Sequence, residues 1–134
     1  MEQVKILVID DDEGMTELLT LLLSPASSEV IVANSGQEGI DLTKKRSPDV
    51  IILDLMMPGM NGWITCKEIR QFSDVPILIL TAMDAPGVVA QALDVGADDY
   101  LLKPVSSGTL IAHLNRLVRR SKVSPATPPP TSTK

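Results

Sequence analysis

Five short runs of aliphatic and β-branched residues alternate with longer amphipathic stretches along the chain. The runs cover residues 4–9, 29–33, 49–54, 76–81 and 99–102, and the last is the weakest. The first, third and fourth are hydrophobic throughout, which is typical of strands that are covered on both faces in a parallel sheet. The starts of the runs lie 20 to 27 residues apart, the length of one strand and one helix. The pattern predicts an α/β fold, a (βα)5 doubly wound domain with a five-stranded parallel sheet.

The stretches between the runs carry the end signals of helices. Asp12 is placed to cap the first helix, and Ser35 with Glu38 has the spacing of a capping box. Pro86 suits the first turn of the fourth helix, and Gly96 suits its end. The expected helices cover about residues 13–23, 36–46, 62–72, 86–95 and 107–122. We therefore expect one domain over residues 1–121 and a Pro/Thr-rich linker or disordered tail over residues 122–134.

The composition narrows the class of protein. A formal net charge of −5 argues against a nucleic-acid-binding surface in this chain. The single cysteine, Cys66, excludes an internal disulfide, and its apolar neighbours predict a small buried thiol rather than a nucleophile. No apolar run approaches the length of a membrane span, and residues 1–5 lack the features of a signal peptide. These features predict a cytoplasmic domain that does not contact a membrane.

Polar side chains follow four of the predicted strands. Asp10 and Asp11 come after the first run, Asp54 ends the third, Thr81 ends the fourth, and Lys103 follows the fifth. In open parallel sheets these positions meet at one edge, where ligands bind. Two carboxylates about 4 Å apart repel by roughly 4 kcal/mol at an effective dielectric near 20, so a cluster of them needs cations. An all-oxygen site beside a lysine suits Mg²⁺ shared with a phosphate, and a carboxylate there is a candidate nucleophile toward phosphorus.

Four segments stand in an order and spacing that point to one family. They are ILVIDDDE at 6–13, DLMMPGMNG at 54–62, LTA at 80–82 and GADDYLLKP at 96–104. Together they resemble the receiver domain of bacterial two-component response regulators, over about residues 3–121. The resemblance implies a flavodoxin-like fold with strand order 2-1-3-4-5. It also implies a signalling switch rather than an enzyme, loaded with a phosphoryl group by a sensor histidine kinase or a phosphotransfer protein.

The resemblance implies a role for each acid of the cluster. Asp54 would be the phosphoacceptor. Asp10 and Asp11 would be the acidic pair that holds Mg²⁺, with Asp11 binding the ion directly and Asp54 beside it. The main-chain carbonyl of Met56 would be a further ligand. Asp12 is excluded from this set, because its place before a helix makes it an N-cap.

The resemblance also implies which residues respond to the phosphoryl group. Thr81 and Lys103 would contact its oxygens, and the Lys103–Pro104 peptide bond would be cis. Tyr100 would be the aromatic side chain that moves inward when Thr81 shifts toward the phosphate. His113, the single histidine, lies in the middle of a helix with no partner at metal-ligand spacing, so we interpret it as structural or solvated.

The fourth and fifth helices depart from the larger subfamily of DNA-binding regulators, which carries a salt-bridged dimer face there. The basic residue of that face in helix four falls on Val89, and its acid and base in helix five fall on Thr109 and His113. Helix four is also apolar nearly all round, more than one buried stripe requires. We expect an apolar docking surface near Val88 and Val89. It would serve a homodimer or an effector through the face of the fourth helix, fifth strand and fifth helix.

Three other functions use similar residues. A Mg-dependent phosphatase of the haloacid-dehalogenase type would form its aspartyl phosphate on the first strand, at Asp10. Its expected Gly-Thr does not follow promptly here, because Glu13 comes before Gly14 and Met15 stands before Thr16. A flavin-binding module on the same fold is disfavoured, because three aspartates would repel its phosphate. A non-phosphorylated pseudo-receiver is a binding-module alternative, although such domains usually lack part of a site that is complete here.

Overall fold

The computed structural model describes residues 4–24 and 29–123, in which strands and helices alternate. The elements are β1 (Lys5–Ile9), α1 (Glu13–Leu23), β2 (Glu29–Ala33), α2 (Gly36–Arg46), β3 (Val50–Leu53), α3 (Gly62–Arg70), β4 (Ile77–Thr81), α4 (Pro86–Asp94), β5 (Asp99–Leu102) and α5 (Ser107–Val123). The final helix continues two residues past the predicted domain boundary at residue 121. Residues 124–134 of the predicted tail lie outside the described residues.

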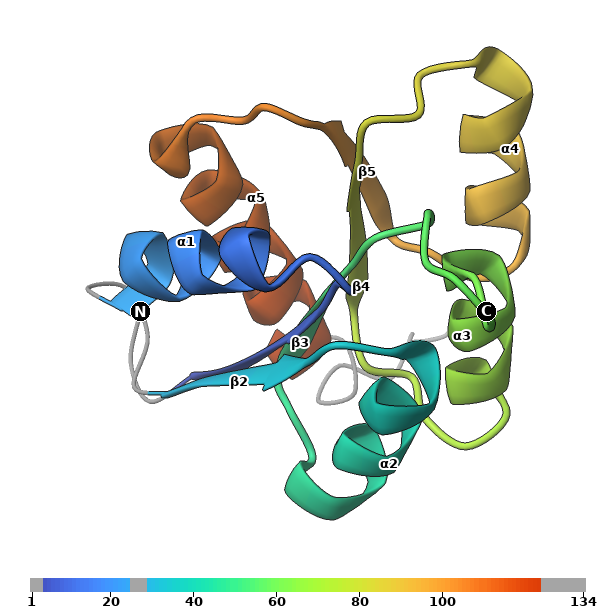
Figure 1. Cartoon of the computed structure of the whole chain (residues 1–134). Helices are drawn as coiled ribbons and strands as arrows, with labels where there is room; N and C mark the ends of the chain where they lie inside the picture. The colour runs from blue at the N-terminus through green and yellow to red at the C-terminus, as the bar shows by residue number, and fades with distance from the viewer. Residues whose placement is uncertain (1–3, 25–28, 124–134) are drawn as a thin grey trace, which may run out of the picture.

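The five strands form one sheet in the order β2-β1-β3-β4-β5, and every neighbouring pair is parallel. Both the predicted fold class and the predicted strand order are therefore confirmed. Helices α1 and α5 lie on one face of the sheet, and α2, α3 and α4 lie on the other (Figure 1). The switch in helix side occurs between β1 and β3, whose carboxyl ends consequently border the crevice in which open α/β sheets bind ligands.

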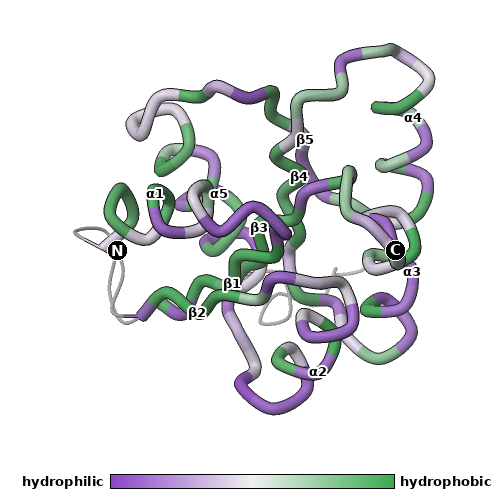
Figure 2. Tube along the Cα trace, viewed as in Figure 1, coloured by the Kyte–Doolittle hydropathy of each residue, from purple (hydrophilic) through white to green (hydrophobic). Residues whose placement is uncertain are grey.

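The three central strands, β1, β3 and β4, are buried on both faces, as their continuous hydrophobicity predicts. Leu7, Ile9 and Ile51 belong to a core cluster shared with α2, α3 and α4. Ile6 and Val8 belong to a second cluster shared with α1 and α5. Figure 2 shows the central strands in the hydrophobic colour, while α2 is largely hydrophilic. Two helical layers around one sheet make a rigid support for residues at the strand ends.

Side-chain caps set the starts of three helices. The Asp12 carboxylate accepts a hydrogen bond from the Met15 amide at 3.2 Å, and the Ser35 hydroxyl accepts one from the Glu38 amide at 3.1 Å. Both predicted caps are thus confirmed. Asn61 caps α3 in the same way, accepting from the Ile64 amide at 3.0 Å. Each cap satisfies an amide that has no partner within its helix.

Helix α3 ends earlier than the predicted residue 72. The amides of Gln71 and Phe72 bond to carbonyls three residues back, those of Glu68 and Ile69, which is the tighter pattern common in a last turn. On the inner face of α3, Cys66 is buried, as predicted, and its thiol lies 3.7 Å from the Val95 carbonyl. Burial raises the pKa of this thiol to about 11, so it is not a reactive thiolate.

Candidate functional site

The predicted polar residues meet at the carboxyl edge of the sheet. The register places Ile9 of β1 opposite Leu53 of β3, and the Asp54 amide donates to the Ile9 carbonyl at 3.0 Å. Asp10 and Asp54 therefore lie side by side, each directly after the end of one of two adjacent strands. Thr81 is the last residue of β4 and pairs with Leu102 of β5, directly before Lys103. Strand pairing alone brings together side chains that are up to 93 residues apart in sequence.

Three carboxylates and one ammonium form the centre of this edge. Oxygens of Asp10, Asp11 and Asp54 all lie within 4.8 Å of one another. Asp10 and Asp54 are buried, at 3% and 7% exposure, whereas Asp11 is exposed. The Lys103 Nζ lies 2.8 Å from Asp10 Oδ2 and 3.6 Å from Asp54 Oδ2. One lysine balances only part of this charge, so the oxygen-only cluster fits a hard divalent cation such as Mg²⁺.

The two buried acids also hold the charge of Lys103. Burial by itself would lower the pKa of this ammonium. The hydrogen bonds and charges of Asp10 and Asp54 outweigh that effect and hold the pKa above its ordinary value. Lys103 is therefore a permanent cation at neutral pH. The peptide bond that follows it, Lys103–Pro104, is cis, as the resemblance implied.

The loop after β3 surrounds Asp54. The Met56 amide points at Asp54 Oδ1 from 3.4 Å, and the Met56 side chain is 57% exposed beside it. Gly59 adopts a positive φ of 76°, which a turn accepts most readily from glycine. The Gly62 amide then returns to the Leu55 carbonyl at 3.0 Å. This closed loop holds the acid in place at the end of β3.

Thr81 has a buried hydroxyl without a partner. The residue is fully buried, and its Oγ1 makes no hydrogen bond within the described part of the chain. A buried hydroxyl normally finds a partner, so an unpaired one beside a cation cluster fits a site that receives an anionic ligand.

Tyr100 sits close by, half-buried, and its hydroxyl donates to the Met83 carbonyl. Burial, followed by the charges of Asp84 and Asp54, raises the pKa of its phenol. The tyrosine thus links β5 to the loop that follows Thr81. A movement of that loop would break or shift this hydrogen bond.

The surface of α4 differs in part from the prediction. Val88 is half-buried and packs against the core cluster, so it contributes less to the outer surface than expected. Val89 is also half-buried, while Leu93 one turn later is 46% exposed. The reason is geometric, because a nine-residue helix with apolar residues on most sides packs some of them against the core. The spacing of apolar residues in the sequence did not show which of these valines would face the core. The apolar surface therefore centres on Val89 and Leu93.

Two acids of the neighbouring face are occupied within the chain. Asp99 Oδ2 lies 2.6 Å from His113 Nδ1 and 2.7 Å from Arg116 Nη2. Asp98 accepts from Arg70 Nη2 at 2.8 Å and from the Ile77 amide at 2.8 Å. The interpretation of His113 as structural agrees with this contact. Sequence spacing did not reveal its partner, which lies on a different element.

Acidification is expected to remove the stabilising effect of Asp99. Burial acts to raise its pKa, but bonds from His113 and the Tyr100 amide, with the charge of Arg116, lower it overall. A lowered folded-state pKa adds stability above the unfolded value of about 3.9, and this is lost as the pH falls through the lower folded value. We expect Asp99→Asn to lower the free energy of unfolding by about 1 kcal/mol at neutral pH. At a pH below the folded-state pKa of Asp99, we expect no difference.

Urea unfolding of both proteins over that pH range measures the difference. Asp94→Asn, on the exposed end of α4, is the control. A cost that stays constant down to the lowest pH would show that the Asp99 carboxylate charge does not carry the effect.

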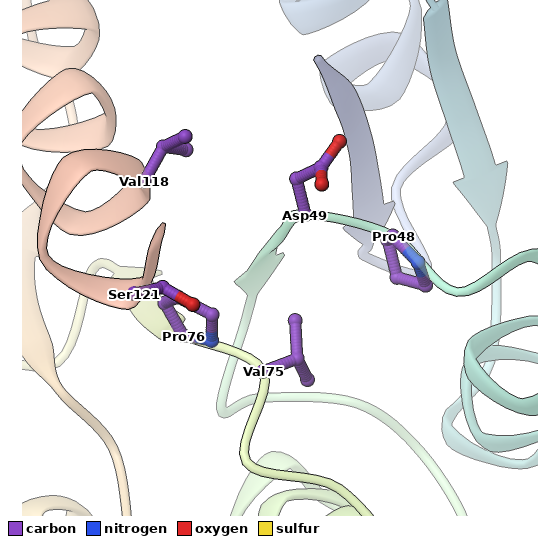
Figure 3. Close-up of a pocket in the computed structure, with 6 residues that line it drawn as sticks. All are labelled: Pro48, Asp49, Val75, Pro76, Val118 and Ser121. Carbon is purple, nitrogen blue, oxygen red and sulfur yellow. The ribbon is translucent and has the colours of Figure 1, made fainter. Parts of the chain in front are cut away.

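A small hollow lies at the opposite end of the sheet from the acid cluster. It has a volume of about 110 Å³ and is lined by Pro48, Asp49, Val75, Pro76, Val118 and Ser121 (Figure 3). Its one carboxylate, on Asp49, accepts from the Lys5 amide at 2.8 Å. The hollow lies where the segments before β3 and β4 meet the end of α5. The hollow does not offer the cation and anion contacts found at the carboxyl edge.

Comparisons with known proteins identify the family of the chain. Residues 6–115 match the model of the response regulator receiver domain. The chain is 41% identical over 120 residues to a probable transcriptional regulator, ycf27, of Porphyridium aerugineum, covering 90% of this chain and 50% of that protein. It is 38% identical over 122 residues to the DNA-binding response regulator MtrA of Mycolicibacterium smegmatis, covering 91% and 54%. The chain thus spans about half the length of the curated relatives it matches.

Solved structures show the same fold. The receiver domain of the Francisella response regulator 1452 superimposes with a TM-score of 0.82 at 34% identity, over 89% of this chain and 99% of that one. The chemotaxis protein CheY4 of Vibrio cholerae gives 0.80 at 34% identity, over 86% and 98%. Within residues 4–24 and 29–123, every helix is too short or too polar to cross a membrane. The family match over most of its length shows that the chain belongs to the response regulator receiver domains of two-component systems, which are signalling proteins.

Proposed function

We propose that the chain is a phosphorylation-dependent switch in which Asp54 accepts a phosphoryl group from a sensor histidine kinase or a phosphotransfer protein. The observation that carries the proposal is the contact of one half-buried ammonium, that of Lys103, with two buried carboxylates, beside the unpaired hydroxyl of Thr81. In this reaction an Asp54 oxygen forms a bond to phosphorus. The bond from phosphorus to the donor nitrogen breaks, and its electron pair leaves with the donor.

The residues around Asp54 have separate roles in this transfer. Asp10, Asp11, Asp54 and the main-chain carbonyl of Met56 would hold Mg²⁺, which when bound neutralises charge on the phosphoryl oxygens. Lys103 provides a second positive charge within reach of Asp54, and its raised pKa keeps it protonated. The chain supplies positions and charges rather than a separate catalytic base, so it assists its own phosphorylation without being an enzyme in the ordinary sense.

The change would pass from the site to the surface through Thr81 and Tyr100. A phosphoryl group on Asp54 offers acceptor oxygens to the unpaired Thr81 hydroxyl, which would draw the end of β4 toward the site. Tyr100 now bonds to the Met83 carbonyl in the loop after β4, and a shift of that loop would release the phenol to turn inward. The populations of the α4–β5–α5 surface would then change between two states.

Mass spectrometry after incubation with acetyl phosphate and Mg²⁺ tests the function. We expect one phosphoryl group, located on Asp54 after borohydride trapping, and none in Asp54→Asn. The same experiment separates the other functions. Label on Asp10 would support the haloacid-dehalogenase type of phosphatase. Absence of label with acetyl phosphate and with several purified histidine kinases would support a pseudo-receiver that only binds partners.

We expect the surface of α4 to bind the output partner. Asp98 and Asp99 are paired within the chain, so the apolar residues Val89 and Leu93 are the part of this face that we expect to meet a homodimer or an effector. We expect Val89→Arg to reduce self-association of the phosphorylated chain, because a buried arginine without a partner is costly at an interface. Sedimentation velocity with and without beryllofluoride measures this. Lys67→Arg, at an exposed position of α3, is the control. Unchanged sedimentation and partner binding would remove Val89 from the interface.

A further inference from the structure

We infer that Asn34 is a positioning residue of the acid cluster, acting through the main chain of Asp10; this rests on the proposed Mg²⁺ site. Asn34 directly precedes Ser35, the residue predicted to cap α2, but the two side chains have different partners. The Ser35 hydroxyl alone accepts from the Glu38 amide, while the Asn34 side chain turns to the sheet and its Nδ2 donates to the Asp10 carbonyl at 2.9 Å.

The contact extends the β1–β2 ladder by one bond. The register runs from Lys5 opposite Glu29 to Ile9 opposite Ala33, and the Asp10 amide still donates to the Ala33 carbonyl at 3.0 Å. In a continuing parallel strand the next donor, toward the Asp10 carbonyl, would be the amide of residue 35. Strand β2 ends at Ala33, however, and α2 begins at residue 36. The Asn34 amide group takes the place of that missing donor.

Asn34 is itself held firmly enough to act in this way. Its main-chain amide donates to Glu38 Oε1 at 2.8 Å, and the Glu38 amide donates to the Ser35 hydroxyl at 3.1 Å. The first bond ties Asn34 itself to the first turn of α2, and it does not involve the Ser35 hydroxyl, which caps the helix. The start of a helix that packs on the sheet thus supports the side chain that reaches Asp10.

The consequence for the site lies in the peptide unit between Asp10 and Asp11. A peptide unit is planar, so a bond that fixes its carbonyl also fixes the direction in which the next residue leaves. Asp10 has further anchors: Oδ1 accepts from the Asp12 amide at 3.0 Å and Oδ2 lies 2.8 Å from Lys103 Nζ. Asp11 is exposed, and its place near Asp54 depends on the path of its main chain. Asn34 controls that path.

Titration of Mg²⁺ into the whole chain by calorimetry tests the inference. Outer partners of metal ligands typically change affinity by 10–100-fold, so we expect Asn34→Ala to raise the Mg²⁺ dissociation constant by about 10-fold. Ser35→Ala is the matched control, because it removes the α2 cap and leaves the Asp10 contact intact. We expect it to lower the thermal midpoint without changing the dissociation constant. Asn34→Leu, of similar volume, replaces Asn34→Ala if the alanine variant does not fold.

The outcomes separate the inference from the function beneath it. Equal Mg²⁺ affinity of wild type and Asn34→Ala overturns the positioning role and leaves the proposed switch standing. Equal weakening by Ser35→Ala also overturns it, because the effect would then come from the cap of α2. A wild-type chain that binds no Mg²⁺ overturns the metal site and the inference together.

Discussion

Exchange of Lys103 for methionine is expected to cost the metal-free protein about 3 kcal/mol of its unfolding free energy. The side chains of Asp10 and Asp54 are only 4% and 9% exposed, and the Lys103 side chain is 17% exposed. Removal of the ammonium leaves two buried carboxylates facing each other without a counter-charge. Methionine keeps most of the apolar stem, so the loss reports the charge rather than a cavity.

The pH dependence of this loss follows from the raised pKa of Lys103. A group with a raised folded-state pKa contributes its full stability below its unfolded value, about 10.4 for lysine, and loses it as the pH rises through the higher folded value. The difference between wild type and Lys103→Met should therefore be constant around neutral pH and shrink only in strong alkali. Urea unfolding at several pH values measures it.

Mg²⁺ supplies the decisive comparison for Lys103. An ion that binds only the folded state stabilises it, and a cluster without its lysine has more uncompensated charge for the ion to neutralise. We expect Mg²⁺ to stabilise Lys103→Met more than wild type. Lys67→Met, on the exposed side of α3, controls for loss of a surface charge and should change stability by less than about 0.5 kcal/mol. A loss at Lys103 no larger than this would show that the acids do not need the lysine.

Local rules were sufficient to predict the elements and two of the caps. The continuous hydrophobicity of β1, β3 and β4 indicates burial on both faces, and this property alone separates a parallel sheet from an antiparallel one. Asp12 and Ser35 were predictable as caps because a cap and its amide lie three residues apart. The end of α3 was less predictable, because the last turn tightened instead of stopping at a breaker residue.

The strand-end residues of the site were predictable for a different reason. In a parallel sheet, the carboxyl ends converge regardless of sequence separation, so Asp10, Asp54 and Lys103 could be grouped once the strands were known. Contacts that depend on side-chain direction could not be grouped in this way. The pairing of Asp99 with His113 and of Asn34 with the Asp10 carbonyl both cross from one element to another. The sequence around each of these residues gives no sign of its partner, because the partner lies on another element.

Replacement of Gly62 by alanine is expected to disturb the site without touching any of its side chains. A Cβ at this position would lie 2.3 Å from the Asp54 carbonyl oxygen and 2.6 Å from the Leu55 Cα. Both obstacles are main-chain atoms, which cannot rotate away as a flexible side chain can. The start of α3 must move outward, or the main chain at Asp54 must shift. Overpacking of this kind typically costs about 1–3 kcal/mol, measurable by urea unfolding.

The functional effect of Gly62→Ala follows from where the strain falls. The Gly62 amide also donates to the Leu55 carbonyl at 3.0 Å, so the helix start and the phosphoacceptor loop move together. We expect slower labelling of Asp54 by acetyl phosphate, in addition to the lost stability. Gly108→Ala is the matched control. It also adds a methyl in the first turn of a helix, but into open space, and should be neutral or stabilising by about 0.4–1 kcal/mol. If Gly62→Ala labels as fast as wild type, the phosphoacceptor tolerates movement of its main chain, and close packing of the start of α3 against the loop after β3 serves the fold rather than the switch.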